Sequence, residues 1–251
     1  MKLFSFGGLD SFSSCSESPS FCVENNETKV LIDAPVRITS YLRELNLSLI
    51  DLSAVIITHL HNDHVEGLTE LIQLRMLLTK FPEKAPLLGF MKKEVTEKLT
   101  VYVFGNDFSW FRDVKKIVER NCPTKWGCVD DYVEWRFVAD TKGVLQIGDC
   151  RFEFCKNEHD VFCVGLKING FAISGDTPFE EEFENWLWQN SKIIFHELGG
   201  GGCHTLMMDL PKLREKINDQ KKLFFYHVPE ICLKILEDNG FAVVQKRGYE
   251  V

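Results

Sequence analysis

The sequence predicts a layered α/β fold of the α+β kind, in which two β-sheets stack together and helices cover their outer faces. Short strand-like segments gather in the middle of the chain and then alternate with helical segments towards its end. Hydrophobic residues make up 45% of the 251 residues and charged residues 26%, which is enough for a large core. There is neither an internal repeat nor a long linker, so we expect a single domain over residues 1–251.

The first half of the chain contains two apolar runs that we expect to form buried strands. Residues 30–34 (VLIDA) end at a proline, and residues 52–58 (LSAVIIT) are rich in β-branched side chains. Apolar side chains at helical spacing predict helices over residues 38–45 and 67–80. Two further elements are expected after them, a strand over residues 87–90 and a helix over residues 92–99.

In the second half, glycines and polar turns separate short strands, and helices enter towards the end. The helix expected over residues 178–189 has an early proline and acidic residues in its first turns, as the helix dipole favours. Further helices are expected over residues 211–218 and 229–238, and Asn239-Gly240 closes the last one. The expected strands cover residues 132–139, 144–147, 151–155, 163–168, 171–174, 192–196, 223–227 and 241–245.

Charge and cysteine content restrict the function classes. The chain has 29 basic and 37 acidic residues, a net charge of −8, so bulk binding of nucleic acid is not expected because it requires a basic face. The N-terminus is a poor signal peptide, and no stretch approaches the ~20 apolar residues of a membrane span. Nine cysteines, an odd number, fit reduced thiols better than a disulfide framework. We therefore expect a cytoplasmic protein that does not contact membranes.

A dense cluster of metal-binding residue types follows the strand expected at residues 52–58. It reads H-x-H-x-D-H and contains His59, His61, Asp63 and His64. Spacing of two after a strand lets His59 and His61 point to one side, and the turn before the next helix can aim the other two there. Four ligands in six residues exceed what one tetrahedral zinc needs alongside distant ligands, so two adjacent metals are expected. A polar surface loop is the alternative.

Three more polar residues stand where an apolar strand stops. His159 ends one expected strand, Asp176 lies between a strand and a helix, and His227 precedes the proline that starts another helix. Taken singly, a hydrogen-bonded histidine or a helix-capping aspartate would be the ordinary interpretation. Together with the cluster, all three are expected to be metal ligands.

The order H-x-H-x-D-H, lone His, G-D-T and lone His resembles the metallo-β-lactamase superfamily over nearly the whole chain. The resemblance implies a four-layer αββα sandwich with a dinuclear metal site, occupied by two Zn²⁺ ions, although Mn²⁺ or Fe²⁺ also suit the ligands. Asp33 matches the early L-I-D aspartate that orients a ligand histidine in the family; a turn residue is the alternative. The resemblance assigns His59, His61 and His159 to one metal, Asp63, His64 and His227 to the other, and Asp176 to both.

Three local features are similar to the phosphodiesterase branch that includes ribonuclease Z. They are G-D-T at residues 175–177, H-E at residues 196–197, and H-T at residues 204–205 behind four glycines. The resemblance implies hydrolysis of a nucleotide phosphodiester by metal-bound hydroxide, which Asp63 orients. His204 would stabilise the transition state or protonate the leaving oxygen, and Glu197 would hold its ring. A plain loop histidine is the alternative.

Two features depart from the members that process transfer RNA. The interval from His159 to Asp176 has room for two strands and a turn, so the RNA-binding arm is absent, and the chain is acidic. We therefore expect a small substrate such as a cyclic nucleotide, and a homodimer. Three alternatives remain: a tRNA 3′-processing endonuclease, a lactonase or thioester hydrolase on the same fold, and a binding protein with a degenerate site.

Residues 101–130 have the least regular pattern and are rich in aromatic side chains. We interpret them as an insertion that forms a lid over the site or a contact between two chains. Deleting residues 104–126 should then lower activity or change the oligomeric state. An additional helix packed on the core is the alternative.

Overall fold

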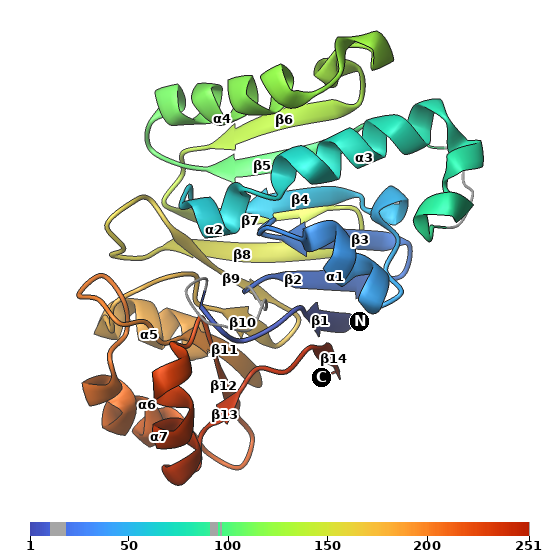
Figure 1. Ribbon diagram of the computed structural model, residues 1–251. Helices are drawn as coiled ribbons and strands as arrows, with labels where there is room; N and C mark the ends of the chain where they lie inside the picture. The colour runs from blue at the N-terminus through green and yellow to red at the C-terminus, as the bar shows by residue number, and fades with distance from the viewer. Residues whose placement is uncertain (11–18, 91–94, 96, 251) are drawn as a thin grey trace.

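The computed structural model describes residues 1–10, 19–90, 95 and 97–250, and its framework is two stacked β-sheets (Figure 1). Among the described residues, each sheet has seven strands. The first sheet has the order β14 (Arg247–Glu250), β1 (Lys2–Ser5), β2 (Phe21–Asn25), β3 (Thr28–Ile32), β4 (Ala54–Ile57), β5 (Leu99–Phe104) and β6 (Val133–Val138). The second has the order β13 (Ala242–Val243), β12 (Lys222–Tyr226), β11 (Ile193–Glu197), β10 (Phe171–Ile173), β9 (Val164–Ile168), β8 (Cys150–Lys156) and β7 (Lys142–Ile147).

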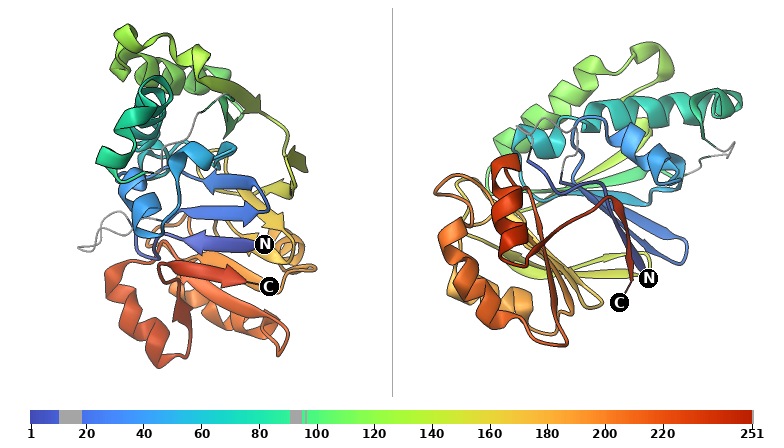
Figure 2. Two further views of the ribbon diagram at one scale, coloured as in Figure 1. Left: turned by 90° about the vertical axis from the view of Figure 1, so that its right-hand side faces the viewer. Right: turned by 60° about the horizontal axis from the view of Figure 1, so that its bottom comes forward.

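Helices cover the outer face of each sheet, and the two sheets enclose the central core (Figures 1 and 2). The first sheet is covered by α1 (Ile38–Glu44), α3 (Leu68–Lys80) and α4 (Phe108–Asn121), with the short α2 (Asn62–Val65) at its edge. The second is covered by α5 (Glu181–Trp188), α6 (Leu210–Lys216) and α7 (Leu233–Asp238). The expected αββα sandwich is therefore confirmed.

Alternation along buried strands explains how one sheet serves two cores. In β3, Val30 and Ile32 pack between the sheets, whereas Leu31 packs against the helices. Successive side chains of a strand point to opposite faces, so a run that is apolar throughout is buried on both sides. This is why the uninterrupted apolar runs in the sequence predicted β3 and β4 correctly.

Several sequence-based expectations need correction. The strand expected over residues 87–90 is wrong, because Pro86–Leu88 form a 3₁₀ turn that ends at Gly89, whose φ of 77° breaks an extended chain. The helix expected over residues 92–99 falls partly on residues 91–94 and 96, which lie outside the described residues, and Leu99 begins β5.

The aromatic segment is not a single insertion, which corrects the expectation for its first residues. Residues 101–104 belong to β5, which pairs in parallel with β4 and β6 inside the first sheet. Asp107 caps α4 by accepting a hydrogen bond from the Ser109 N–H, and α4 buries Phe111 and Val118 in the outer core as an additional helix. The lid, the contact between two chains and the single-domain organisation stay predictions.

The two ends of the described chain meet in the first sheet. β1 pairs with β14 in antiparallel register, and Lys2 lies opposite Glu250. Figure 2 shows the N- and C-terminal ends of the chain lying close together. In the parts of the chain that are described, none of the helices combines the length and apolar character needed to cross a bilayer.

Candidate metal centre

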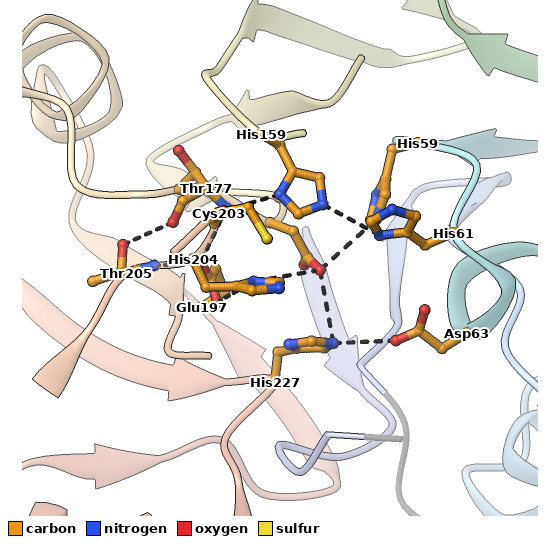
Figure 3. A network of polar contacts seen from close by, with 12 residues as sticks. His59, His61, Asp63, His159, Thr177, Glu197, Cys203, His204, Thr205 and His227 are labelled. Atoms are coloured by element: carbon orange, nitrogen blue, oxygen red, sulfur yellow. Dashed lines mark hydrogen bonds and ion pairs between the residues drawn. The ribbon is translucent and has the colours of Figure 1, made fainter. Parts of the chain in front are cut away.

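Strand ends from both sheets place the candidate residues around one space. β10, β11 and β12 run parallel, so their carboxyl ends bring Asp176, Glu197 and His227 to the same edge of the second sheet. β4 in the first sheet delivers His59, and β8 is followed by His159. Figure 3 shows these histidines, together with His61 and Asp63, facing a common volume.

The structure brings all seven expected ligands together. The ligand atoms of His59, His61, His159 and Asp176 all lie within 4.8 Å of one another, and the same holds for Asp63, His64 and His227. Asp176 lies between the two groups, because its Oδ2 is 3.7 Å from His59 Nε2 and also 3.7 Å from His227 Nε2. Their role as ligands stays a prediction, but the two groups match the division that the sequence resemblance implies.

The buried polar atoms of this cluster fit divalent cations better than they fit one another. His59 Nε2, His64 Nε2 and Asp176 Oδ1 are buried without a hydrogen-bond partner, which is costly unless another group satisfies them. His64 Nε2 lies 3.6 Å from Asp176 Oδ2, longer than a hydrogen bond. Ligand atoms of a tetrahedral zinc lie roughly 3.3 Å apart. The site is therefore built for divalent metal.

Contacts on the far side of the His64 and His159 imidazoles fix the nitrogen of each ring that faces the site. Asp33 Oδ2 is 2.9 Å from His64 Nδ1, and its Oδ1 accepts a hydrogen bond from the Thr58 N–H. Asp33 itself has a φ of 61°, a strained backbone for a residue with a side chain. His159 Nδ1 lies 2.9 Å from the Cys203 carbonyl oxygen. Such outer contacts orient metal-ligating rings.

The charges in the site are strongly coupled. Burial opposes ionisation of Asp176, but the nearby His227 and His64 outweigh it and hold the pKa of this carboxyl well below its usual range. Burial likewise opposes the charged form of His64, yet Asp176 and Asp33 raise the pKa of its imidazole well above normal. The pKa of His59 is lowered by burial and by His64. Metal binding must therefore displace protons from this cluster.

Glu197 and His204 form a second unit that borders the metal ligands. Glu197 Oε1 accepts hydrogen bonds from the backbone N–H groups of Thr177 and Thr205, at 3.0 and 2.8 Å. Its Oε2 lies 3.3 Å from His204 Nδ1, which is itself 3.9 Å from Asp176 Oδ2. Burial disfavours the charged imidazole, but the Glu197 carboxylate outweighs it and raises the pKa of His204.

Sequence reasoning missed the groups that act through backbone atoms. The N–H groups of Thr177 and Thr205 and the carbonyl of Cys203 leave no signal in residue type, apart from the glycines that let the loop bend. His196 is a core histidine, since it is fully buried and its Nε2 lies 2.7 Å from Glu184 Oε1.

Known proteins match most of the chain. The sequence profile of the family described as "Anti-Pycsar protein Apyc1" matches residues 1–250. The Apyc1 protein of Saccharibacillus brassicae is 28% identical over 81% of this chain and 81% of its own length. The cAMP/cGMP-dependent 3′,5′-cAMP/cGMP phosphodiesterase B of Dictyostelium discoideum is 23% identical over 97% of this chain. The chain spans only 21% of that longer protein.

Solved structures share the fold at low sequence identity. The metallo-β-lactamase fold protein YhfI of Bacillus subtilis superposes with a TM-score of 0.72 at 15% identity, over 99% of both chains. The human short-form tRNase Z superposes with a TM-score of 0.68 at 14% identity, over 100% of this chain and 99% of its own. These matches confirm the expected metallo-β-lactamase fold. Because the family profile covers residues 1–250, this chain belongs to the Anti-Pycsar protein Apyc1 family.

Proposed function

We propose that this chain is a dinuclear, zinc-dependent phosphodiesterase that hydrolyses cyclic nucleotides. The observation that carries the proposal is the His204–Glu197 unit facing the same space as the predicted ligands, with His204 Nδ1 at 3.9 Å from Asp176 Oδ2. Hydrolysis of a phosphodiester needs neutralisation of the phosphate charge and a proton for the leaving oxygen. Metal held by the predicted ligands would supply the first, and the His204–Glu197 unit would supply the second. The Dictyostelium relative is named as a cAMP/cGMP phosphodiesterase, which supports the same substrate class.

Two metals would be held by the residues that converge in the structure. His59, His61 and His159 form one set and Asp63, His64 and His227 the other, with Asp176 shared between them. When bound, a pair of divalent cations lowers the pKa of water and offsets the charge of the phosphate. The imidazole-rich set favours zinc, and carboxylate ligands also accept manganese or iron.

The chain's own side chains then divide the proton transfers. Asp63 lies at the rim of the site, where its Oδ2 contacts His227 Nε2 at 3.1 Å and its carboxylate can orient an attacking water. Glu197 raises the pKa of His204 and so favours its protonated form, which can donate to the leaving oxygen.

The glycine loop before His204 leaves room for a substrate. A Cβ at Gly202 would meet nothing within 4 Å, and one at Gly200 would touch only Pro229 at 4.0 Å. An alanine at either position would therefore not clash with the rest of the protein. Close approach of a substrate explains glycines there.

The test is a substrate panel with metal analysis on purified, zinc-loaded protein. The panel contains 3′,5′- and 2′,3′-cyclic nucleotides, linear dinucleotides, a precursor tRNA, a lactone and bis(p-nitrophenyl) phosphate. We expect cyclic nucleotides to be the preferred substrates. His204→Ala should keep its metal and lose roughly 10²- to 10⁴-fold in kcat, whereas Asp176→Ala should lose metal and activity together.

Two outcomes would contradict the proposal. Less than one metal equivalent per chain with no phosphodiester hydrolysis would favour a binding protein with a degenerate site. Lactone hydrolysis that is unchanged in His204→Ala would favour the lactonase alternative, because ester chemistry needs no proton from His204.

A further inference from the structure

A cavity of about 240 Å³ opens directly beside one set of predicted ligands. Asp160 lines this cavity, and its Oδ1 lies 3.5 Å from His61 Nε2 and 3.0 Å from His159 Nε2. Leu60, the neighbour of His61 in the sequence, lines it as well. A phosphodiester held at the metal centre would therefore have the cavity within reach of its remaining groups.

The floor and one wall of the cavity are apolar. Phe104 at the end of β5 and Phe162 before β9 are buried and form its floor. Trp110 on α4 forms a wall and is 52% exposed, although indole rings are usually well buried. An exposed indole over an apolar floor provides the platform on which planar rings stack.

The rim of the cavity carries hydrogen-bond acceptors. Asn106, Asp107 and Asp160 line it, and none of the described residues around it is a lysine or arginine. Asp107 caps α4 by accepting from the Ser109 N–H, and its exposed carboxylate still offers acceptor oxygens to the cavity that it lines. Such a rim disfavours a phosphate and favours a neutral ring whose edge offers N–H groups, as a carboxylate accepts from the amino group of cytosine.

We propose that this cavity binds the nucleobase of the substrate, that Trp110 stacks on it, and that the acidic rim prefers bases with an exocyclic amino group. The inference rests on the proposed phosphodiesterase function and specifies its substrate: cyclic nucleotides of cytosine and adenine are preferred over that of uracil. The role of α4 is then to supply a wall of the substrate site.

Steady-state kinetics on matched variants test the stacking. For 3′,5′-cyclic CMP, Trp110→Ala should raise KM about 5- to 100-fold with kcat nearly unchanged, and Trp110→Phe should recover most of the loss. Phe108→Ala is the control, since Phe108 is 57% exposed on the same helix turn but packs on Phe111 and Phe137 instead of lining the cavity. An unchanged KM in Trp110→Ala overturns the inference.

A substrate without a base separates stacking from a general defect. The probe is 1-deoxyribose 3′,5′-cyclic phosphate, which carries hydrogen in place of the base. We expect Trp110→Ala and the wild type to cleave it equally well. An equal loss on this probe and on cyclic CMP would show that Trp110 acts on the centre itself and would overturn the inference.

The rim is tested by base preference. The wild type should have a KM about tenfold lower for cyclic CMP than for cyclic UMP, and Asp107→Asn, which keeps the helix cap, should narrow that gap. Equal KM values for the two substrates in the wild type would overturn the preference.

A binding measurement separates failure of the base-site inference from failure of the proposed phosphodiesterase activity. If no cyclic nucleotide is hydrolysed, the proposed activity fails, and calorimetry with CMP and with ribose 5-phosphate then decides the cavity alone. Tighter binding of CMP that is lost in Trp110→Ala supports a base site, and equal binding of both probes rejects it.

Discussion

Glu197 controls His204 with a single charge that is held in place by the backbone. Its Oε1 is fixed by two N–H groups, and its Oε2 faces the His204 imidazole. Because the two oxygens of Glu197 have different partners, a mutation can remove the effect of Glu197 on the His204 proton without moving the Glu197 side chain. A glutamine keeps a carbonyl oxygen for the N–H groups but loses the charge.

We predict that Glu197→Gln shifts the pH profile of kcat. The carboxylate raises the pKa of His204, so its removal lowers that pKa and the protonated acid is lost at lower pH. The basic limb of the profile should therefore move to lower pH, while metal content stays at the wild-type level. Profiles measured with cyclic CMP check this, and a superimposable basic limb would contradict it.

Gly199 is required by the His204 ring itself. A Cβ at this position would collide with the imidazole, so Gly199→Ala should displace His204 from Glu197 and lower kcat by about as much as His204→Ala, with metal retained. Gly202→Ala, whose Cβ would meet no protein neighbour, is the matched control for folding and metal content only, because the substrate is expected to approach this glycine. Metal content, circular dichroism and kcat distinguish the variants, and wild-type turnover in Gly199→Ala would refute the requirement.

At the scale of elements, a buried polar pair joins α5 to β11. Glu184 on α5 lies 2.7 Å from His196 Nε2 and also accepts a hydrogen bond from the Trp188 indole N–H. Burial opposes the charged imidazole, but Glu184 outweighs it and raises the pKa of His196 to about 9. The pair fixes the strand that ends in Glu197.

This pair makes stability depend on pH. The folded pKa of His196, about 9, lies above its ordinary value of 6.5, so its stabilisation is fully present below pH 6.5 and is lost as pH rises through 9. Urea unfolding of the zinc-loaded protein at several pH values should show that the free energy of unfolding falls as the pH rises from 6.5 through 9. The decline should be smaller in His196→Gln, and identical pH dependence in both proteins would exclude the pair as its source.

Apolar runs along the sequence predicted some strands well but not every central one, since β5, which lies between β4 and β6, was assigned partly to the expected insertion. β4 is a continuous β-branched run and was located within a few residues. β14 was missed because its sequence RGYE is mostly exposed, and its strand conformation depends on pairing with β1 at the far end of the chain. α4 was expected only as the alternative to an insertion, although the helix is amphipathic and buries Phe111 and Val118.

The same contrast holds for the candidate site. Side chains that stand at strand ends, such as Asp176 and His227, could be predicted because parallel strands carry their ends to one edge. The cavity at Trp110 could not, because it forms only where α4 approaches the loop that carries Asp160.

At the scale of the whole molecule, the predicted ligands come from both sheets, so metal should stabilise the sandwich as a unit. His59 follows β4 in the first sheet, whereas Asp176 and His227 follow strands of the second. Chelation should lower the melting temperature of the wild type, because binding to the folded state alone stabilises it. Asp176→Ala should respond little to a chelator, and a wild type that melts identically with and without one would contradict this linkage.

The homodimer stays a prediction for the assembled protein. Light scattering at several concentrations should give twice the chain mass, and a monomer throughout would contradict it. Ile117 on α4 is 54% exposed, so Ile117→Asp is the variant with which to ask whether this helix contributes to the contact.

The pairing of β1 with β14 has a consequence for how such a unit can be accommodated in larger polypeptides. Both flanks leave from neighbouring points of one sheet edge, so a host protein could accept the unit between two consecutive residues of a surface loop without spreading that loop apart. For protein engineering, this geometry favours circular permutation. A short peptide could join the N- and C-termini at this sheet edge, and new termini could be opened elsewhere in the chain.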